Sequence, residues 1–457
     1  MGDNSLFDVT VVGSGPSGTH AAYPLIKAGL KVAIIDGGLD SKEKDTTDSA
    51  PRVGAKSNAL DILMKGSLAF NKTYQLLKIN SNIEIVQTLA KGGLSEFWHG
   101  LCDFLTDEEL NEVGLPADSI QNEYGIISKL VNLDTKPRLD IHGRLILEKS
   151  PNKVYRLPVT YPYKTSEIIK KFERRKNFTY ISGQVVKTVK EKNGAVEIVS
   201  VSIKNKDESV VKARYAILAT GAINTTRIML RSKNLFNHKT SFLAKNHSMI
   251  VCLHSQTLVK KAEAHIANPG QLGFSSNKTG QKLRAFVQLY RANPVMLSNA
   301  AKYIPLPKLF AEKLLSIFIH SLVIADVRFP AFETKNKFCQ LKRDGGSDIL
   351  QISFNLTSNE LKKQNKELKQ ISQTLKTLGL IPLKIISDPV TSHYGGGVPF
   401  RGRGRLATDI NGKLKNSKHI YIADSAAWRA LPGKPLALTI MANASRIGKE
   451  VLKKLKK

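Results

Sequence analysis

Apolar runs and a helical segment alternate in the first forty residues of this chain. Phe7–Val12 is a largely apolar run of strand type, Ser17–Ala28 has helical character, and Lys31–Asp36 is a second apolar run. Gly29 follows the helical segment, where a residue without a Cβ can adopt the left-handed cap conformation. The pattern predicts a unit of β-strand, α-helix and β-strand at the start of the chain.

Between residues 178 and 219 the pattern changes to alternation of apolar and polar positions. The runs FTYISGQVVKTVK, AVEIVSVSIKN and VVKARYAILAT have a period of two, which is typical of half-buried strands. Asn193–Gly194 separates the first two runs, and Asn-Gly is a favoured pair in tight hairpin turns. The sequence therefore predicts a small antiparallel meander over residues 178–219.

Helical periodicity returns in the second half of the chain. Asn359–Leu378 places its apolar residues on one face. Thr357 and Glu360 form a capping box at its start, and Gly379 ends it. This segment is predicted to be a single well-formed helix.

Two other segments are also predicted to be helical. A pair of apolar helices is expected near Leu306–Ile324, and a further helix near Leu60–Ala69. The wider stretch Leu306–Val327 could form an amphipathic surface helix, but burial in a substrate-binding domain is the preferred interpretation.

The turn between the first strand and the first helix carries a specific motif. Gly13 permits a tight turn, Gly15 lets the backbone approach a pyrophosphate, and Gly18 lets helix and strand pack closely. The helix N-terminus offers free N–H groups to phosphates, and Asp36 can accept hydrogen bonds from ribose hydroxyls. The combination predicts a dinucleotide site. Its predicted cofactor-binding residues are Gly13, Gly15, Pro16, Ser17, Gly18 and Asp36.

A second apolar strand favours FAD over NAD as the dinucleotide. Tyr215–Ala219 ends in Thr220 and Gly221 and is followed by a helical segment. In flavoproteins with two such fingerprints, this strand returns to the dinucleotide after an antiparallel insertion, which the meander would supply. A plain NAD dehydrogenase needs no such insertion. The pattern places Thr220 and Gly221 at the FAD and leaves direct use of NAD as an alternative.

Further motifs follow in the order found in a known family of flavoenzymes. They are Lys91–Gly100 (KGGLSEFWHG), His393–Gly396 (HYGG), Leu406–Asp409 (LATD), His419–Asp424 (HIYIAD) and Gly433–Thr439 (GKPLALT). From end to end the chain therefore resembles the glucose–methanol–choline (GMC) oxidoreductase family. Its first motif is similar to the corresponding segment of the pyranose-oxidase branch.

The resemblance implies an FAD-dependent enzyme that oxidises a CH–OH group, of a sugar or other polyol, by hydride transfer to flavin N5. His393 matches the family's catalytic histidine and would act as the base, since an imidazole titrates near neutrality. The last helix would direct its N-terminus at the flavin. The other residues that the resemblance assigns to the cofactor are Gly92, Gly93, Ser95, Trp98, Asp424, Pro435 and Leu436.

Two positions depart from the family pattern. Lys434 stands where the family has His or Asn, and a lysine is a point charge without an acceptor. As a predicted catalytic residue it would steady an alkoxide or a reduced flavin, or bind a substrate phosphate or carboxylate; it could equally mark altered chemistry. Phe97 stands where pyranose oxidases have a His that binds FAD covalently, so non-covalent FAD is expected. No metal site is predicted.

The net charge of +31 over 457 residues is the unusual bulk property of the chain. It fits a phosphorylated or glycan-linked substrate or contact with an anionic membrane surface, or it only decorates solvated faces. No nucleic-acid motif accompanies the charge, so no specific nucleic acid is expected. Cys102, Cys252 and Cys339 lack the spacing of a disulfide framework or a zinc site, which favours a reducing compartment.

The start of the sequence has no secretory pattern, and no apolar window is long enough to span a bilayer, so a cytoplasmic protein is expected. The predicted fold is α/β, a Rossmann-like FAD-binding domain with an interleaved substrate domain built on an antiparallel sheet. Residues 1–240 and 380–457 would form the FAD-binding domain, and residues 241–379 the substrate domain.

Two other functional classes stay open at this point. One is a flavin enzyme of another kind on the same fold: a reductase, an isomerase, or a lyase with a structural FAD. The other is a polyanion- or membrane-binding protein that retains the fold, as the excess of positive charge would allow. The oligomeric state is left open as well.

Overall fold

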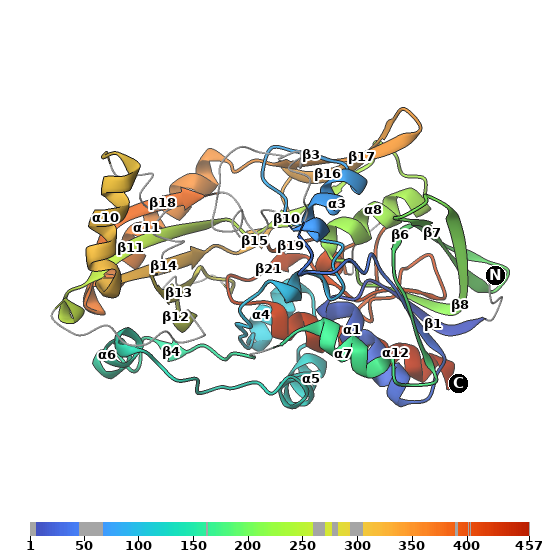
Figure 1. Cartoon of the computed structure of the whole chain (residues 1–457), viewed down its shortest axis with the longest axis horizontal. Coiled ribbons are helices and arrows are strands. Elements are labelled where there is room, and N and C mark those ends of the chain that lie inside the picture. The colour runs from blue at the N-terminus through green and yellow to red at the C-terminus, as the bar shows by residue number, and fades with distance from the viewer. Residues whose placement is uncertain are drawn as a thin grey trace.

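The computed structural model describes residues 6–44, 67–160, 163–258, 270–276, 282–292, 305–388, 392–400, 402 and 404–456. Two large sheets lie one after the other along the long axis of the molecule (Figure 1). The first strand and the last helix of the chain lie at the same end. The helix predicted near Leu60–Ala69 falls mostly outside the described residues, which resume with helix α3 (Leu68–Leu76).

The first sheet has seven strands and a parallel core. Strand β1 pairs in parallel with β2 and β8, and β20, from the C-terminal part of the chain, pairs in parallel with β8. Strands of such a core are buried on both faces and therefore read as continuous apolar runs. The sheet runs in the order β5 (Phe178–Ile181), β2 (Val32–Ile35), β1 (Phe7–Val12), β8 (Glu208–Leu218), β7 (Ala195–Ser202) and β6 (Gln184–Lys192), with β20 (Ile420–Ile422) beside β8.

The antiparallel meander is present as β6, β7 and β8, and it is shorter than the sequence pattern suggested. The hairpin turn falls at Asn193–Gly194, where both φ angles are positive, 50° and 76°. Gly183, with φ of 71°, interrupts the first alternating run. The residues before it form β5, which pairs in parallel with β2. Strand β5 therefore belongs to the parallel core and not to the meander.

Two helices from opposite ends of the sequence pack against each other beside this sheet. Helix α1 (Pro16–Lys27) follows β1 directly, and α12 (Ala437–Leu455) closes the described chain. A Cβ at Gly448 of α12 would lie 2.2 Å from the carbonyl oxygen of Ala21 in α1. Because Gly448 has no side chain, the C-terminal helix can lie directly on the helix that starts at the fingerprint.

The second large sheet has six strands, and its neighbouring strands pair in antiparallel fashion. Helices α11 (Ser358–Thr377) and α6 (Ile141–Lys149) pack on one of its faces in a single apolar cluster that includes Ile146, Leu368 and Ile371. The order of strands is β18 (Leu380–Asp388), β11 (His247–His254), β14 (Leu322–Arg328), β13 (Phe286–Arg291), β12 (Gly270–Ser275) and β4 (Tyr155–Arg156).

Two strands of this sheet come from outside the predicted substrate segment 241–379. Strand β4 lies in the part of the chain assigned to the FAD-binding domain, and β18 begins at Leu380. The predicted division at residue 379 therefore falls just before a strand of the same sheet. The chain crosses between the two sheets repeatedly, so the two regions are interleaved.

Smaller elements surround the two sheets. A four-stranded sheet contains β3 (Ile79–Ser81), β17 (Ser347–Phe354), β16 (Lys337–Asp344) and β9 (Lys239–Ser241). The two-stranded pairs are β10 (Leu243–Ala244) with β19 (Tyr394–Gly395) and β15 (Ala331–Phe332) with β21 (Ala430–Leu431). The other helical elements are α4 (Asp107–Val113), α5 (Ala117–Leu130), α7 (Thr165–Phe172), α8 (Ala222–Ser232), η1 (Gly93–Glu96), η2 (Ser255–Thr257), η3 (Ile319–Ser321) and η4 (Ser425–Ala427).

The long helix predicted in the second half of the chain is confirmed as α11. The Glu360 N–H donates to Thr357 Oγ1 over 3.2 Å, and the Thr357 N–H donates to a Glu360 carboxylate oxygen over 2.8 Å. Gly379 follows the helix with φ of 84°. The local capping signals therefore determined both ends of this helix.

The prediction for Leu306–Val327 was wrong in two respects. In place of a helix pair there is one helix, α10 (Lys308–Phe318), followed by η3 and then by β14. Burial holds for β14, but Leu309 and Ile317 of α10 are 73% and 70% exposed. A short apolar run has the same composition in a buried strand and in an exposed helix, so periodicity alone could not separate them.

Cys102, Cys252 and Cys339 are all buried and unpaired. Burial raises the pKa of the Cys252 and Cys339 thiols to about 12, which keeps both thiols protonated. In the described part of the chain, no helix combines the length and the apolar character that crossing a membrane requires.

The contact between α1 and α12 provides a test of the fold. Substitution Gly448→Ala should lower the free energy of unfolding by about 1–3 kcal/mol, because the new methyl group meets the Ala21 carbonyl. Gly125, inside α5, has no atom within 4 Å of the position of an added Cβ. Gly125→Ala is the matched control and should raise the free energy of unfolding by about 0.5–1 kcal/mol. Urea denaturation measures both; equal effects would contradict the close packing.

Candidate active site

A cavity of about 510 Å³ lies where the two large sheets meet. The first sheet contributes the turn after β1, the end of β2 and the turn between β8 and α8. The second sheet contributes side chains of β13 and β14, and the start of α12 closes the cavity from the C-terminal part. Such a position, at the carboxyl ends of parallel strands, is where α/β proteins bind nucleotides.

Most of the predicted site residues line this one cavity, although they come from segments far apart in the sequence. His393 is among them, while Gly18, Gly92 and Lys434 are not. The predicted residues in the lining are Gly13, Gly15, Pro16, Ser17, Asp36, Gly93, Ser95, Trp98, Thr220, Gly221, His393, Asp424, Pro435 and Leu436. Their functional roles stay predictions.

The fingerprint glycines are in the positions that their expected roles require. Gly13 has φ of 101°, and a Cβ at Gly18 would lie 1.9 Å from the Gly13 carbonyl oxygen. Only a glycine lets α1 start this close to β1. Gly15 is the residue before α1, so the first N–H groups of the helix open onto the cavity that Gly15 lines.

Asp36 ends β2 inside a network of hydrogen bonds. Its Oδ2 accepts from Ser14 Oγ at 2.5 Å, from the Tyr180 hydroxyl at 3.1 Å and from the Gly38 N–H at 3.2 Å. Burial raises the pKa of Asp36 to about 6, although these hydrogen bonds oppose the shift. These hydrogen bonds hold the Asp36 carboxylate in the cavity wall, where it can also accept from a ligand hydroxyl.

The segment around Gly92 forms a second wall of the cavity and contacts the glycine-rich turn after β1. The Gly92 N–H donates to Ser14 Oγ over 2.9 Å, and the Gly92 carbonyl accepts from Ser95 Oγ at 2.7 Å. A Cβ at Gly93 would lie 3.4 Å from Gly15 Cα. Trp98 Nε1 donates to the Tyr163 carbonyl, so its ring is fixed as part of the cavity lining.

Asp424 is a buried carboxylate in the lining of the cavity. Its carboxylate accepts from the Gly221 N–H at 2.9 Å, Thr225 Oγ1 at 2.6 Å and the Ala426 N–H at 2.9 Å. Burial raises its pKa to about 6. Because both oxygens are engaged, Asp424 ties the turn between β8 and α8 to η4 and so positions Gly221 at the cavity.

Sequence reasoning missed three polar residues of the lining that lack partners for some of their buried atoms. Within the described part of the chain, neither amide atom of Gln87 has a hydrogen-bond partner, and Asn224 Oδ1 and Arg227 Nε also lack one. Such buried groups are costly unless a ligand or water satisfies them. A dinucleotide carries many hydroxyl groups and phosphate oxygens, so the helix N-terminus and these unpartnered donors and acceptors fit FAD.

The far end of the cavity holds an ion pair that the sequence did not reveal. Arg328 Nε donates to Asp326 Oδ2 over 2.8 Å, and Asp326 Oδ1 is 3.1 Å from His247 Nδ1. Burial opposes ionisation of Asp326, yet Arg328 and His247 hold its pKa well below the usual range. Gln288 and Tyr290, which hydrogen-bond each other, line the same end.

Arg328 also determines the protonation of His393. Its Nη1 lies 2.9 Å from His393 Nδ1. A guanidinium only donates, so Nδ1 must accept and the neutral ring carries its proton on Nε2. Burial, and then the charges of Lys245 and Arg328, lower the pKa of His393 well below its usual range. His393 is therefore a neutral imidazole whose only lone pair, at Nδ1, faces Arg328.

Lys434, predicted to act in the active site, does not line the cavity in this structure. Its Nζ lies 2.9 Å from Glu109 Oε2 and donates to the Phe104 carbonyl at 3.0 Å. The side chain thus turns toward α4, where an acidic partner is available. Lys245 holds this loop from the other side, because its buried Nζ donates to the carbonyls of Gly433 and Lys434. The cation within hydrogen-bonding distance of the His393 ring is Arg328.

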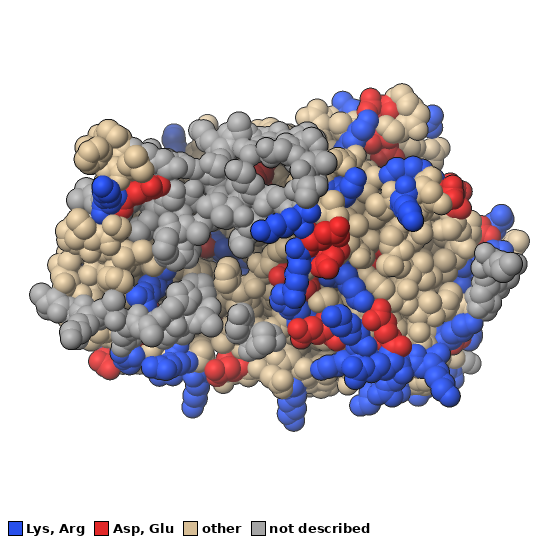
Figure 2. Space-filling model, in the orientation of Figure 1, with Lys and Arg blue, Asp and Glu red and all other residues tan. Residues whose placement is uncertain are grey.

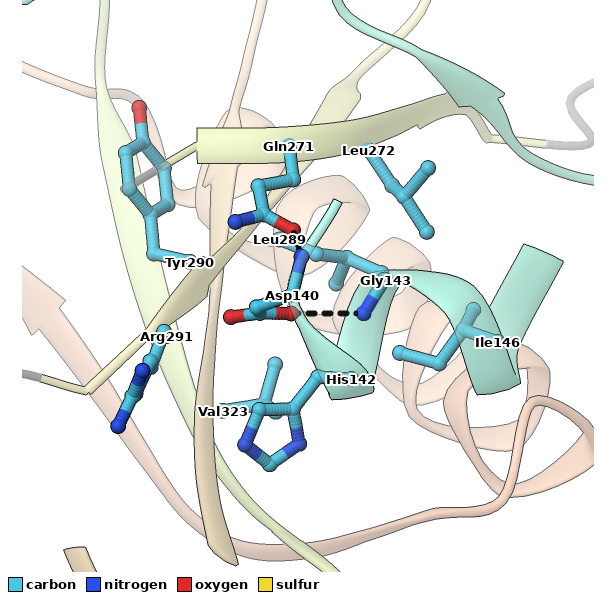
Figure 3. A pocket seen from close by; sticks show the side chains of 10 residues that line it. All are labelled: Asp140, His142, Gly143, Ile146, Gln271, Leu272, Leu289, Tyr290, Arg291 and Val323. Carbon is cyan, nitrogen blue, oxygen red and sulfur yellow. Dashed lines mark hydrogen bonds between the residues drawn. The ribbon is translucent and has the colours of Figure 1, made fainter. Parts of the chain in front are cut away.

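A second cavity in the six-stranded sheet is too small to be a ligand site. It measures about 10 Å³, roughly the space of one water. Figure 3 shows Asp140 beneath Gln271, with its carboxylate bound to the Gly143 N–H at 2.9 Å as the cap of α6. Among the residues that the structure describes, no three His, Cys, Asp or Glu side chains are grouped so that they could hold a metal ion.

No family model and no curated protein matches this sequence. Among solved structures, the chain is similar to the crystal structure of pyridoxine 4-oxidase from Mesorbium loti. The TM-score is 0.66, the match covers 97% of this chain and 99% of that chain, and 13% of the residues are identical. The two proteins share a fold. The likeness confirms the predicted α/β class and, at this identity, extends no further than the fold.

The geometry of Asp36 leads to a prediction for cofactor binding. Asp36→Ala should weaken FAD binding by about 10- to 150-fold, because a hydrogen bond to a charged group contributes about 1.5–3 kcal/mol. Titration of the apoprotein with FAD, followed by flavin fluorescence, measures the affinity. Asp40→Ala, an exposed carboxylate four positions later, is the control and should bind normally. Equal affinity of the two variants would exclude contact between Asp36 and the cofactor.

Proposed function

We propose that this protein is an FAD-dependent oxidoreductase that oxidises a CH–OH group of a sugar or other polyol derivative. The observation that carries the proposal is a single cavity with two ends. One end has the fingerprint glycines and Asp36, and the other has His393 beside Arg328. A substrate held at the second end would meet the redox group of a dinucleotide held at the first.

The comparison with solved structures supports the oxidoreductase part of the proposal. The match to pyridoxine 4-oxidase agrees with the resemblance of the motifs to the GMC family. It gives no support to the pyranose-oxidase branch. The proposal of a sugar substrate therefore depends on the similarity of Lys91–Gly100 to the pyranose-oxidase segment. It also depends on the polar lining of the substrate end of the cavity, where Gln288, Tyr290 and Arg328 can bind hydroxyl groups.

The residues at the substrate end account for the proton of the alcohol. Bound FAD would accept the hydride from the substrate carbon. The substrate hydroxyl would take the place of the Arg328 Nη1 at His393 Nδ1, the one nitrogen with a lone pair, and His393 would accept the proton there. Arg328, held by Asp326, would remain beside the oxygen and stabilise its negative charge. This is the electrostatic role that the sequence had assigned to Lys434.

The proposal is tested first by the colour of the protein. The purified chain should bind FAD, and acid precipitation should release the flavin because Phe97 leaves no covalent link at that position. Anaerobic mixing with sugars, polyols, phosphorylated or nucleotide-linked sugars, and pyridoxine should bleach the bound flavin for one class of compound. A protein that binds FAD but is bleached by no alcohol would favour another flavin chemistry. A protein without FAD would refute the proposal.

The base is tested by the rate of this bleaching. His393→Ala should slow flavin reduction by about 10²–10⁴-fold, the usual contribution of a general base, while leaving FAD binding intact. His238→Ala, an exposed histidine outside the cavity lining, is the control and should reduce at the normal rate. Stopped-flow absorbance measures both rates. An unchanged rate in His393→Ala would remove His393 from the mechanism.

The role of Arg328 is tested by the pH dependence of flavin reduction. His393 can accept a proton only while its ring is neutral. Because its pKa lies well below 6.5, the ring is neutral at pH 6.5, and the wild-type rate of flavin reduction should fall only when the pH drops to that lowered pKa. Removing the cation in Arg328→Met should raise that pKa and shift the acid limb of the rate to higher pH. The pair Asp326→Asn with Arg328→Met avoids leaving Asp326 unpaired. An acid limb that does not move would contradict the coupling.

A further inference from the structure

Helix α10 exposes an apolar face that no part of the described structure covers. Leu309, Phe310, Ile317 and Phe318 are between 43% and 73% exposed. At 100° per residue these four side chains lie within one half of the helix circumference. Ala311, just outside this half of the circumference, is fully buried. Of the described apolar side chains of α10, the small one is therefore buried and the four large ones are exposed.

The position of α10 makes this face accessible. The helix lies at one end of the long axis of the molecule (Figure 1), and its chain continues through η3 into β14. The same end appears as a mostly uncharged surface in Figure 2. Large exposed apolar patches on soluble domains mark contact with another protein or with a membrane.

Exposed lysines lie on α10 and on a neighbouring element that is joined to it through η3. Lys313 lies on α10 itself, Lys149 is the last residue of α6, and Lys153 follows α6, whose His142 is tied to the η3 carbonyl of His320 over 2.8 Å. Lys153 reaches Thr377 Oγ1, at the end of α11, over 3.3 Å. Along the edge of the molecule that carries α6 and β4, Figure 2 shows both blue and red side chains, of which the blue ones cover more of the surface.

The exposed lysines on these elements outnumber the acidic residues that adjoin them in the sequence. Lys376, near the end of α11, adds a further exposed positive charge. The described acidic side chains nearest in sequence to the rim lysines are Glu148 and Glu312. Apolar side chains within a basic rim match the two signals that peripheral binding to an anionic bilayer requires.

We propose that α10 and its basic rim dock this protein onto an anionic lipid bilayer. The apolar side chains of α10 would enter the interface, and the rim lysines would contact lipid phosphates. The excess of positive charge over the whole chain, +31, would strengthen the same attraction at longer range. The contact would be peripheral, because the helix has only 11 residues.

One apolar cluster connects this surface with the candidate active site. The cluster contains Val251, Leu322 and Ile324 on the face of the sheet that also carries Arg328. Ile319, next to α10, and Tyr290, in the cavity lining, both pack against it. Docking by α10 would therefore bring the substrate end of the cavity toward the bilayer.

The proposal is tested by sedimentation of the full chain with lipid vesicles. The protein should bind vesicles of phosphatidylcholine mixed with phosphatidylglycerol and bind pure phosphatidylcholine more weakly, and added salt should reduce binding to the mixed vesicles. The triple variant Leu309→Ser, Phe310→Ser, Ile317→Ser should lose at least about tenfold in affinity, because three apolar side chains no longer leave water. The control Ile126→Ser with Val210→Ser removes exposed apolar residues elsewhere and should bind normally.

Insertion of α10 itself is followed by fluorescence. Phe310→Trp should give an emission that shifts to the blue and is quenched by brominated lipids only in anionic vesicles. Trp98 and the buried Trp428 give the background, which wild-type protein measures.

Three results would overturn the proposal. The first is absence of binding to any vesicle, and the second is binding of the triple variant with the same affinity as the wild type. The third is light scattering that shows a dimer for the wild type and a monomer for the triple variant. The last result would assign the face to a second copy of the chain. None of these measurements depends on enzymatic turnover. Their outcome is therefore independent of whether the proposed oxidation is correct.

Discussion

The architecture depends on the close approach of α1 to β1 at the fingerprint. Gly18 lets the first turn of the helix lie against the carbonyl of Gly13, and Gly448 lets α12 lie on α1 in turn. These contacts have no room for a side chain, so they fix where the C-terminal part of the chain returns. Pro435 and Leu436, just before α12, thereby reach the cavity that the N-terminal glycines line.

Polar groups in the cavity divide into those that the protein already holds and those that it leaves unpartnered. Asp36 and Asp424 accept several hydrogen bonds each, and burial raises the pKa of both to about 6. The side-chain amide of Gln87 has no hydrogen-bond partner among the residues that the structure describes. The first kind shapes the walls, whereas the second kind has capacity for a ligand, since buried polar atoms in native proteins are normally satisfied. The distribution fits a cavity built around a bound polar molecule.

The pair of Arg328 and His393 gives the substrate end its character. An arginine cannot accept a proton from the imidazole, so the pair leaves His393 neutral with a defined tautomer. Asp326 orients the guanidinium and balances its charge. The protein thus has a neutral acceptor next to a permanent cation, an arrangement suited to taking a proton from a hydroxyl group while the oxygen keeps its negative charge. The proposed chemistry depends on this arrangement more than on any single side chain.

The sequence by itself determined the elements whose cause is local. The βαβ unit and its glycines, the Asn193–Gly194 turn and the capped helix α11 follow from backbone conformation and short-range hydrogen bonds, which neighbouring residues decide. Only the tertiary structure decided the partner of Lys434, the contact of Arg328 with His393, and the exposure of α10. These features depend on which distant parts of the chain come into contact. A charged residue or an apolar run in the sequence does not by itself indicate what it will contact in the folded protein.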